Sequence, residues 1–153
     1  MNTDVIYLDY AKAFDKVDHN ILLNKLKNIG ITGKVLQWIK AFLSDRTQTV
    51  VINGNKSRPA KVISGVPQGT VLGPLLFLVY VNDIYNCINN VHISSFADDT
   101  RLLHGIKSCQ DQIVLQEDLL NVIEWSNKNN MKLNDKKYGL LCHDGTNETL
   151  KSV

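Results

Sequence analysis

The chain has 153 residues, of which 44% are hydrophobic and 21% charged, a composition that excludes a disordered tail or a fibre and fits one compact domain. The formal net charge of +2 permits a nucleic-acid partner without requiring one, and three cysteines without C-x-x-C spacing indicate neither a disulfide framework nor a zinc site. Because no segment has the composition of a signal peptide or a membrane span, we expect an intracellular protein of the nucleus or cytoplasm with no membrane partner.

The first thirty residues predict a strand followed by a helix. Residues 4–8 favour β structure and end at Asp9, which is the pattern of a buried strand that places a carboxylate at its end. Asp18 is suited to cap a helix, which we expect to end at Gly30. The apolar positions that recur at helical spacing between them are Leu22, Leu26 and Ile29.

A second helix is predicted over residues 34–44. Its apolar side chains fall on one face, and Trp38 lies close to that face. We therefore expect Trp38 in the core rather than as a ring that stacks on a ligand. The face consists of Val35, Ile39, Phe42 and Leu43.

A hairpin follows over residues 47–63, because Asn53-Gly54 is a strong tight-turn signal between two β-favouring runs. Its tip carries Lys56 and Arg58. Two groups of Lys and Arg residues along the chain, 25–61 and 128–137, fit either a surface that follows a phosphate backbone or an ordinary solvated face. The sequence leaves both readings open.

The middle of the chain combines a segment rich in glycine and proline, residues 64–77, with a predicted long buried helix, residues 71–88. In Pro67-Gln68-Gly69 the proline fixes one dihedral angle, the glutamine supplies an amide, and the glycine frees the backbone to approach a ligand. An ordinary loop is the alternative, although it does not explain why the segment runs directly into the helix.

The remaining elements are a second hairpin, a helix and a last strand. Residues 92–96 and 101–103 flank Asp98 and Asp99, so these carboxylates are expected at a hairpin tip. Ser108 and Asp111 resemble a capping box, which predicts a helix over residues 108–129. The apolar side chains expected on this helix are Ile113, Leu119, Leu120, Val122 and Ile123, and residues 138–142 are expected to form the final strand.

Three carboxylates, those of Asp9, Asp98 and Asp99, end strands or hairpins, and they converge if the first strand lies beside the second hairpin. Their mutual repulsion would then be relieved by a divalent cation, and hard oxygen ligands favour Mg²⁺ or Mn²⁺ over zinc. Two such ions suit phosphoryl transfer. The alternative is that these aspartates serve as turn or cap residues.

At these residues the sequence resembles the palm of a reverse transcriptase, most closely that of the non-LTR (LINE-like, jockey-like) retrotransposons. Four segments carry the resemblance, and their order and spacing agree with the family across about residues 3–142. They are Leu8 to His19, Ser64 to Phe77, Phe96-Ala97-Asp98-Asp99, and Leu133-Asn134-Asp135-Lys136-Lys137.

The resemblance implies an α+β polymerase palm in which an antiparallel sheet packs on helices. It implies that Asp9 and Asp98 bind two Mg²⁺ ions, with Mn²⁺ possible, and that Asp99 supports them. It further implies that Lys137 protonates the leaving pyrophosphate. The positions implied to contact the nucleotide are Ala13, Phe14 (a gate against the ribose 2′-hydroxyl, or else core packing), Pro67, Gln68 and Gly69.

The resemblance also implies an RNA-directed DNA polymerase that adds deoxynucleotides (dNTPs) to a DNA primer on an RNA template. The fingers, thumb and endonuclease regions are missing, so we expect residues 1–153 to be a fragment that works within a larger polypeptide. The alternative is a catalytically inactive retrotransposon remnant that acts at most as a nucleic-acid-binding or interaction domain. A palm of the group II intron or telomerase type fits less well.

The other polar residues of the chain are expected to be structural. Asp15, Asp18 and His19 are assigned to turns or caps. The three other histidines, His92, His104 and His143, are expected at the surface or in packing without a partner.

Overall fold

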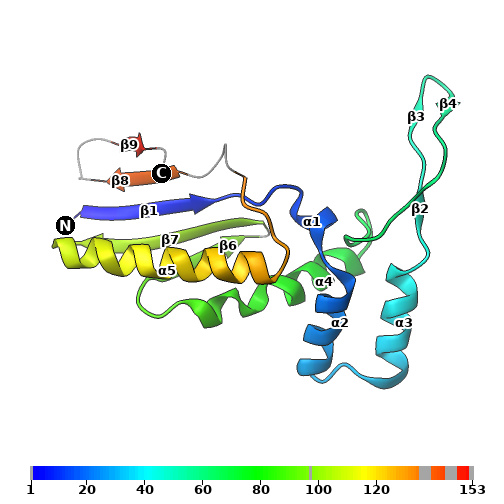
Figure 1. Ribbon diagram of the computed structural model, residues 1–153, viewed down its shortest axis with the longest axis horizontal. Helices are drawn as coiled ribbons and strands as arrows, with labels where there is room; N and C mark the ends of the chain where they lie inside the picture. Colours follow the sequence, from blue (N-terminus) through cyan, green and yellow to red (C-terminus); the bar gives the residue numbers. More distant parts are fainter. Residues whose placement is uncertain (1, 97, 135–138, 144–147, 152–153) are drawn as a thin grey trace. The chain divides into compact units, whose positions relative to one another are not determined.

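The computed structural model describes residues 2–96, 98–134, 139–143 and 148–151. The chain forms two compact units. The first, which we call the sheet unit, comprises residues 1–13 and 81–153, and the second, the helical unit, comprises residues 14–80. An antiparallel sheet packed on helices is present, so the predicted α+β class is confirmed (Figure 1).

The sheet unit is built on five strands in the order β6-β7-β1-β8-β9, each antiparallel to its neighbours. The strands are β1 (Asn2–Leu8), β6 (His92–Phe96), β7 (Asp99–Ile106), β8 (Gly139–His143) and β9 (Glu148–Lys151). The predicted last strand corresponds to β8, with Tyr138 outside the described residues, whereas β9 was not predicted. Strand β7 is longer than the predicted segment 101–103.

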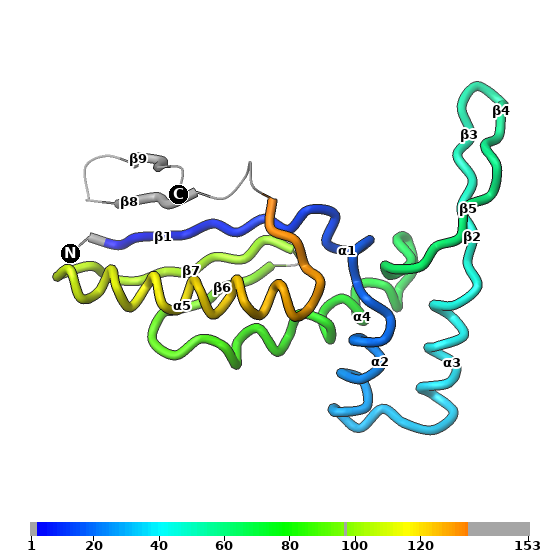
Figure 2. Tube along the Cα trace, in the orientation of Figure 1, coloured from blue at the N-terminus to red at the C-terminus, as the bar shows by residue number. Residues whose placement is uncertain are grey.

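The centre of the sheet is β1, which pairs with β7 on one side and with β8 on the other. Segments far apart in sequence therefore lie side by side, as the blue and yellow-green traces of Figure 2 show. The β1–β7 register runs from Asn2 opposite Ile106 to Leu8 opposite Thr100. The inward positions Ile6, Leu8 and Leu102 are 4% exposed or less.

Helix α5 (Cys109–Lys128) packs along β7 and on the 3₁₀ helix η1 (Asn82–Cys87). Its start is the predicted capping box of Ser108 and Asp111, which is confirmed. The side chains that it buries include Leu115, Leu119, Val122 and Trp125. Ile113 and Leu120, two of the expected apolar positions, lie instead about half exposed, at 49% and 54%.

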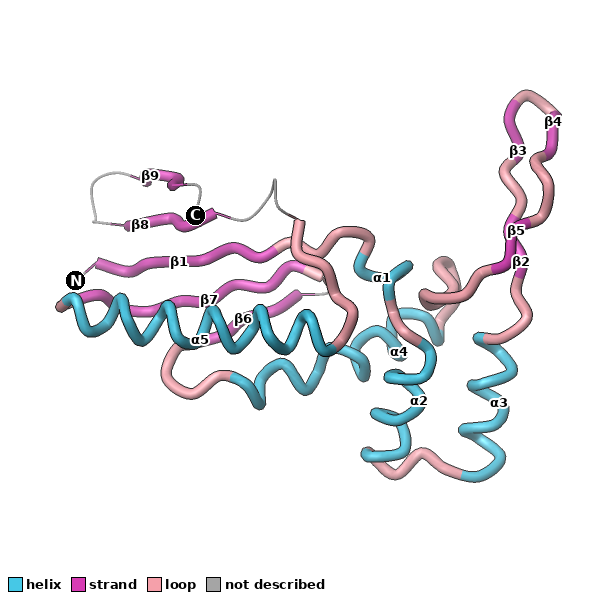
Figure 3. Tube along the Cα trace, viewed as in Figure 1, coloured by secondary structure: helices cyan, strands magenta, loops and turns pink. Residues whose placement is uncertain are grey.

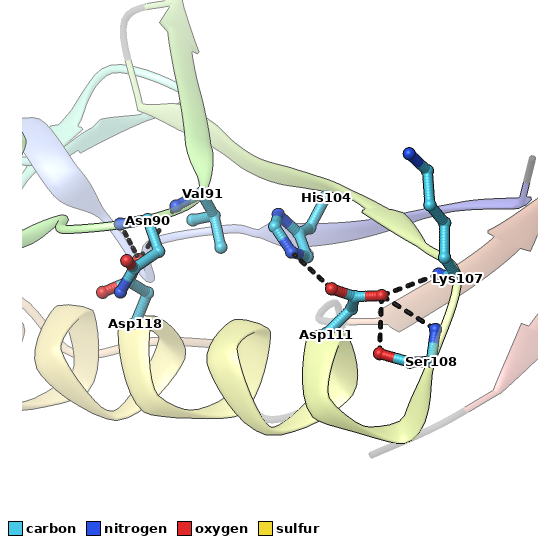
Figure 4. Close-up of polar contacts among 7 residues, drawn as sticks. All are labelled: Asn90, Val91, His104, Lys107, Ser108, Asp111 and Asp118. Carbon is cyan, nitrogen blue, oxygen red and sulfur yellow. Dashed lines mark hydrogen bonds and ion pairs between the residues drawn. The ribbon is translucent and has the colours of Figure 1, made fainter.

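A fully buried carboxylate joins α5 to the start of β6. Asp118 is 0% exposed, and its oxygens accept hydrogen bonds from the backbone N–H groups of Asn90 (2.8 Å) and Val91 (3.0 Å) (Figure 4). The backbone N–H of Asn89 donates to the same carboxylate at 3.1 Å. The Asn121 amide donates a fourth bond at 3.2 Å. Because a buried charge is tolerated only when its hydrogen bonds are made, this cluster fixes the chain just before β6.

A second carboxylate, that of Asp111, holds the chain where β7 ends. It accepts bonds from the backbone N–H groups of Lys107 and Ser108, both at 2.8 Å (Figure 4). The same carboxylate lies 4.0 Å from His104 Nε2. The expectation that His104 has no partner is therefore wrong, because the strand β7 extends past the predicted segment and brings this ring to the start of α5.

The helical unit contains α1 (Ala13–Lys16), α2 (His19–Asn28), α3 (Gly33–Leu43) and α4 (Leu72–Val81), apart from Ala13 and Val81, which belong to the sheet unit. The predicted cap of α2 is confirmed, since Asp18 Oδ1 accepts from the N–H groups of Asn20 and Ile21 at 2.8 and 3.1 Å. Gly30 follows the end of α2 with a φ of +92°, a left-handed conformation that glycine adopts without steric cost.

The predicted core position of Trp38 on α3 is wrong. Its side chain is 59% exposed and stacks on Phe42, with ring centroids 5.7 Å apart. Ile39 and Leu43 are the buried residues of the helix, while Val35 is 59% exposed. Helix α3 packs on α2, and this packing leaves Val35 and Trp38 exposed.

The first hairpin is an arm of two short ladders, in which β3 (Val51–Ile52) pairs with β4 (Asn55–Lys56) and β2 (Thr47–Gln48) pairs with β5 (Ala60–Lys61) (Figure 3). The predicted Asn53-Gly54 turn connects β3 to β4, and both residues have positive φ angles, +49° and +81°. Every residue from 47 to 61 is exposed.

The predicted helix 71–88 is two elements, because α4 ends at Val81 and η1 continues from Asn82 as a 3₁₀ helix. Asn and Asp side chains compete for backbone hydrogen bonds and so disfavour continuation of an α-helix at Asn82 and Asp83. The Asp83 carboxylate also accepts a hydrogen bond from the Trp125 Nε1–H at 3.0 Å. The helix is also not buried on all sides, since Leu75 and Leu78 are 55% and 52% exposed. Across the described residues, no helix is both long and apolar enough to span a membrane.

Replacing Asp118 by Asn is expected to lower the free energy of unfolding by about 2–3 kcal/mol, because an amide places an N–H group against backbone donors in a buried site. Burial raises the pKa of Asp118, but its N–H donors outweigh burial and leave the pKa below its ordinary value. The stabilisation is therefore present above the unfolded-state pKa of about 3.9 and is lost as the pH falls through the lower folded-state value.

Urea unfolding at pH 7 and at pH 3 measures both effects. The matched control is Glu117→Gln at the exposed neighbouring position, which is expected to change stability by less than about 0.5 kcal/mol. Equal stability of the Asp118→Asn and Glu117→Gln variants at pH 7 would show that the carboxylate does not hold the loop.

Candidate active site

The β1–β7 register places two of the predicted carboxylates at the same edge of the sheet. Leu8 pairs with Thr100, so Asp9 follows β1 where Asp99 begins β7. Phe96 pairs with Asp99, which leaves Asp98 in the turn between β6 and β7. Antiparallel pairing thus brings Asp9 next to the hairpin turn from nearly ninety positions away in the sequence.

Asp9 and Asp99 line one open pocket of about 360 Å³. Its other lining residues are Tyr7, Leu8 and Thr100. Asp9 is half-buried, Asp99 is exposed, and Asp98 is half-buried in the turn without lining the pocket. Two carboxylates that face the same open space provide oxygen ligands of the kind that Mg²⁺ binds together with substrate phosphates.

Asn134 orients the Asp9 carboxylate. Its side-chain amide donates to Asp9 Oδ2 at 2.9 Å, and its backbone N–H donates to the Asp9 carbonyl at 2.8 Å. The strand-like contact continues through the bridge between Tyr10 and Leu133. The sequence placed Asn134 in the fourth motif but did not assign it to the site, and an amide three residues before a predicted functional lysine was the available signal.

Tyr10, the residue after Asp9, anchors this end of β1 on α5. Its ring is 4% exposed, and its hydroxyl lies 3.1 Å from the buried Ser126 Oγ. Burial raises the pKa of Tyr10 to about 12, so the phenol remains neutral. A neutral hydrogen-bonded pair therefore holds the chain directly after Asp9, while Asn134 bonds to Asp9 itself.

The donor set fits a hard divalent cation in part. Among the described residues, no group of three His, Cys, Asp or Glu side chains is arranged to hold a metal ion. The acidic residues that line the pocket are Asp9 and Asp99, and one Asp9 oxygen already accepts a hydrogen bond from the Asn134 amide. This chemistry fits Mg²⁺ or Mn²⁺ ligated by carboxylates and by a substrate, not a cage made by the protein alone.

In the helical unit, the predicted nucleotide-contacting loop is bonded to the first motif. Ser64 Oγ donates to the Asp15 carbonyl at 2.8 Å, and the Val66 N–H donates to the Phe14 carbonyl at 3.0 Å. Gln68 is exposed, and its amide donates to Asp15 Oδ1 at 3.2 Å. Two motifs separated by about fifty residues thus form one substructure.

Gly65 is the close-packing point of that substructure. Its φ is +83°, and a Cβ atom there would lie 2.8 Å from the Asp15 Cα. Its carbonyl accepts bonds from His19 Nε2 at 2.9 Å and from Arg46 Nη2 at 2.7 Å. The assignment of His19 to a turn or cap is therefore wrong, because its ring bonds to this distant carbonyl, which the sequence spacing did not indicate.

The remaining predicted positions differ in their surroundings. The Phe14 ring is half-buried and stacks on Phe77 with centroids 4.2 Å apart, so it takes part in packing. Ala13 is 3% exposed. Gly69 has a φ of +77° in the loop, and Lys137 lies outside the described residues.

The Pro67 carbonyl packs directly on α4. Thr70 Oγ1 donates to it at 2.8 Å and accepts from the Gly73 N–H at 3.0 Å. A Cβ atom at Gly73 would lie 2.3 Å from the same carbonyl. The loop therefore has a fixed position on the first turn of α4.

The profile of the family described as "Reverse transcriptase (RNA-dependent DNA polymerase)" matches residues 1–151. The chain belongs to the reverse transcriptase family. It is 32% identical over 143 residues to "Probable RNA-directed DNA polymerase from transposon BS" of Drosophila melanogaster, a match that covers 88% of this chain. It is 35% identical over 139 residues to "RNA-directed DNA polymerase from mobile element jockey" of the same organism, covering 86% of this chain.

The predicted likeness to a jockey-like, non-LTR reverse transcriptase palm is therefore confirmed. The chain spans only 16% and 15% of the lengths of these two relatives. Among solved structures, apo telomerase from Candida Tropicalis truncated from its C-terminal domain matches 97% of this chain and 33% of its own, with a TM-score of 0.71 and 15% identity. This likeness shows a shared fold.

Gly73→Ala is expected to lower the stability of this reverse transcriptase chain by more than about 2 kcal/mol, because the added methyl group would overlap the Pro67 carbonyl and displace the loop. Val71→Ala, at an 88% exposed position two residues earlier, is the control and is expected to change little. Thermal unfolding of both variants measures the difference. Similar melting of the two would mean that the loop does not need its close contact with α4.

Proposed function

We propose that this chain is the palm of an RNA-directed DNA polymerase of a non-LTR retrotransposon, which joins deoxynucleotides to the 3′-hydroxyl of a primer. The observation that carries the proposal is the pair of carboxylates, Asp9 and Asp99, that lines one open pocket at the end of paired strands in a reverse transcriptase chain. The transposon polymerases to which the chain is similar support the choice of reaction.

We propose that Asp9 and Asp98 hold two Mg²⁺ ions, or Mn²⁺, with Asp99 in support. Bound there, the ions would lower the pKa of the attacking hydroxyl and stabilise charge on the leaving oxygen. The contribution of the chain itself is to orient the Asp9 carboxylate, which accepts a hydrogen bond from the Asn134 amide and precedes the anchored residue Tyr10.

The other roles follow from the four motifs. Pro67, Gln68 and Gly69 would contact the incoming nucleotide and the template, and the Gln68 amide is held by Asp15 for this purpose. Ala13 and Phe14 would face the ribose, with Phe14 kept in place by its stack on Phe77. We also propose that Lys137 donates a proton to the leaving pyrophosphate.

The proposed partners are an RNA template, a DNA primer and dNTPs, together with the fingers, thumb and endonuclease regions of a longer polypeptide. Base pairing would select the nucleotide, so the palm needs no base-specific contacts of its own. We propose that the protein acts in the nucleus or the cytoplasm.

The test is a chimera in which this chain replaces the matching 139-residue segment of the jockey polymerase. We expect Mg²⁺-dependent incorporation of dNTPs on an RNA template, and a loss of at least about 100-fold in the Asp98→Asn/Asp99→Asn chimera, because the charge that binds the ions is removed. Asp45→Asn, at an exposed position of the helical unit, is the control and should keep the activity. A folded chimera that binds template and primer but incorporates nothing would favour the inactive remnant.

Asn134→Ala is expected to weaken Mn²⁺ binding by the chain about 10-fold, because it removes a hydrogen-bond donor that orients the Asp9 carboxylate. Electron paramagnetic resonance of free Mn²⁺ measures this without requiring activity. Asn127→Ala, exposed on α5, is the matched control. If Asp9→Asn weakens binding and Asn134→Ala does not, Asn134 has no orienting role.

A further inference from the structure

The two units of the chain carry opposite charge. The helical unit, residues 14–80, contains nine Lys or Arg residues and three Asp residues, an excess of six positive charges. The sheet unit contains eight Lys or Arg and twelve Asp or Glu, an excess of four negative charges. The overall charge of +2 hides this separation, which is the pattern expected when one part of a protein meets a polyanion.

One exposed segment of the helical unit, which we call the arm, carries positive charges and no negative ones. We define it as residues 47–61, in which Lys56, Arg58 and Lys61 are the cations. No Asp or Glu occurs anywhere from residue 46 to residue 82. Solvated surfaces normally mix charges of both signs, whereas the arm, which is exposed at every residue, carries cations only.

The three cations of the arm are available for a partner. Each is exposed, and within the described part of the chain no carboxylate forms an ion pair with any of them. Arg46, by contrast, is used at the base of the arm, where it donates to the carbonyls of Leu43 (3.0 Å) and Gly65 (2.7 Å). The base is therefore fixed to the unit, while the charges beyond it face solvent.

The construction of the arm also indicates a bound partner. Each ladder contains two residue pairs, and an isolated two-stranded hairpin is marginally stable in water. Val50, Val51 and Ile52 are between 56% and 66% exposed on it. Such a structure is stabilised when another molecule covers it.

We propose that the arm is a nucleic-acid-binding element that contacts the phosphodiester backbone through Lys56, Arg58 and Lys61. At about 3.3 Å per extended residue, these cations are spread over about 16 Å, far enough to reach separate phosphates. Backbone contacts of this kind set affinity and position without reading sequence. That the partner is a nucleic acid rather than another polyanion rests on the proposed function. The charge and exposure of the arm are observed independently of that function.

The test is fluorescence anisotropy of a labelled 20-base-pair RNA–DNA hybrid with the full chain between 50 and 200 mM KCl. In Lys56→Gln/Arg58→Gln/Lys61→Gln, three phosphate contacts are lost, so the slope of log K against log salt is expected to become shallower by about 2.7. The charge-conserving variant Lys56→Arg/Arg58→Lys/Lys61→Arg should keep the slope of the original chain.

The matched control removes three exposed lysines from the helices of the same unit, as Lys27→Gln/Lys34→Gln/Lys40→Gln. It is expected to change the slope by less than about 1. Equal effects of the two triple variants would mean diffuse attraction to the unit and would overturn the role of the arm, as would an unchanged slope in the arm variant. All variants must first give the circular dichroism spectrum of the original chain.

Two further comparisons define the partner. Duplex DNA and duplex RNA, each used in place of the hybrid, show whether the arm distinguishes a DNA backbone from an RNA backbone. With each duplex, the salt slope of the arm variant is expected to be shallower than that of the original chain. Polyglutamate that competes as well as the hybrid at equal charge would contradict a nucleic-acid site. The binding measurement contains no nucleotides, so it is independent of polymerase activity. A chimera that incorporates no dNTPs, with arm-dependent binding intact, would count only against the proposed polymerase function. An unaltered salt slope in the arm variant would count only against the proposed role of the arm.

Discussion

The pairing of β1 with β7 is the constraint on which the site depends. Side chains alternate along a strand, so a slip of one residue would move Asp9 to the opposite face and remove it from the pocket that it shares with Asp99. The register is specified by burial, since Ile6, Leu8 and Leu102 must all face the core. Apolar packing at inward positions thus determines where the polar groups at the ends of the strands lie.

Helix α5 maintains this register by holding the chain at three places. Asp118 binds the segment before β6, Asp111 binds the turn after β7, and Ser126 binds Tyr10 beside Asp9. All three contacts are polar and have defined directions, unlike the apolar contacts of the same helix. A hydrophobic face alone would attach α5 to the sheet, whereas these bonds also fix its position along the strands.

The helices and strands were largely predictable because their signals are local. The cap at Asp18, the turn at Asn53 and the capping box at Ser108 each use neighbouring residues, and the structure has all three. The errors at Trp38 and in residues 82–88 arose where tertiary packing decided the outcome. Periodicity shows that a face is apolar, but it does not show how much of the face a neighbouring element covers.

The candidate site was predictable in its residue types more than in its contacts. The aspartates follow strands, which sequence patterns reveal, and the motif resemblance joined them into one group. Asn134 and His19 bond to groups 125 and 46 residues away, and no local pattern encodes such a partner. The requirement for glycine at position 65 was also not predictable from local sequence. A side chain there would clash with the backbone of Asp15, which comes close only in the folded chain.

The separation of charge between the units has a consequence for the proposed chemistry. A polyanion such as a nucleic acid is attracted to the helical unit, with its excess of six positive charges, and repelled by the sheet unit, with its excess of four negative charges. The carboxylates that would hold divalent ions belong to the repelling unit. Ions bound there would therefore offset a local repulsion of the primer and the triphosphate as well as stabilise charge during the reaction. Such a site would attract the primer and the triphosphate only when its ions are bound, whereas the proposed backbone contacts of the arm would not depend on those ions.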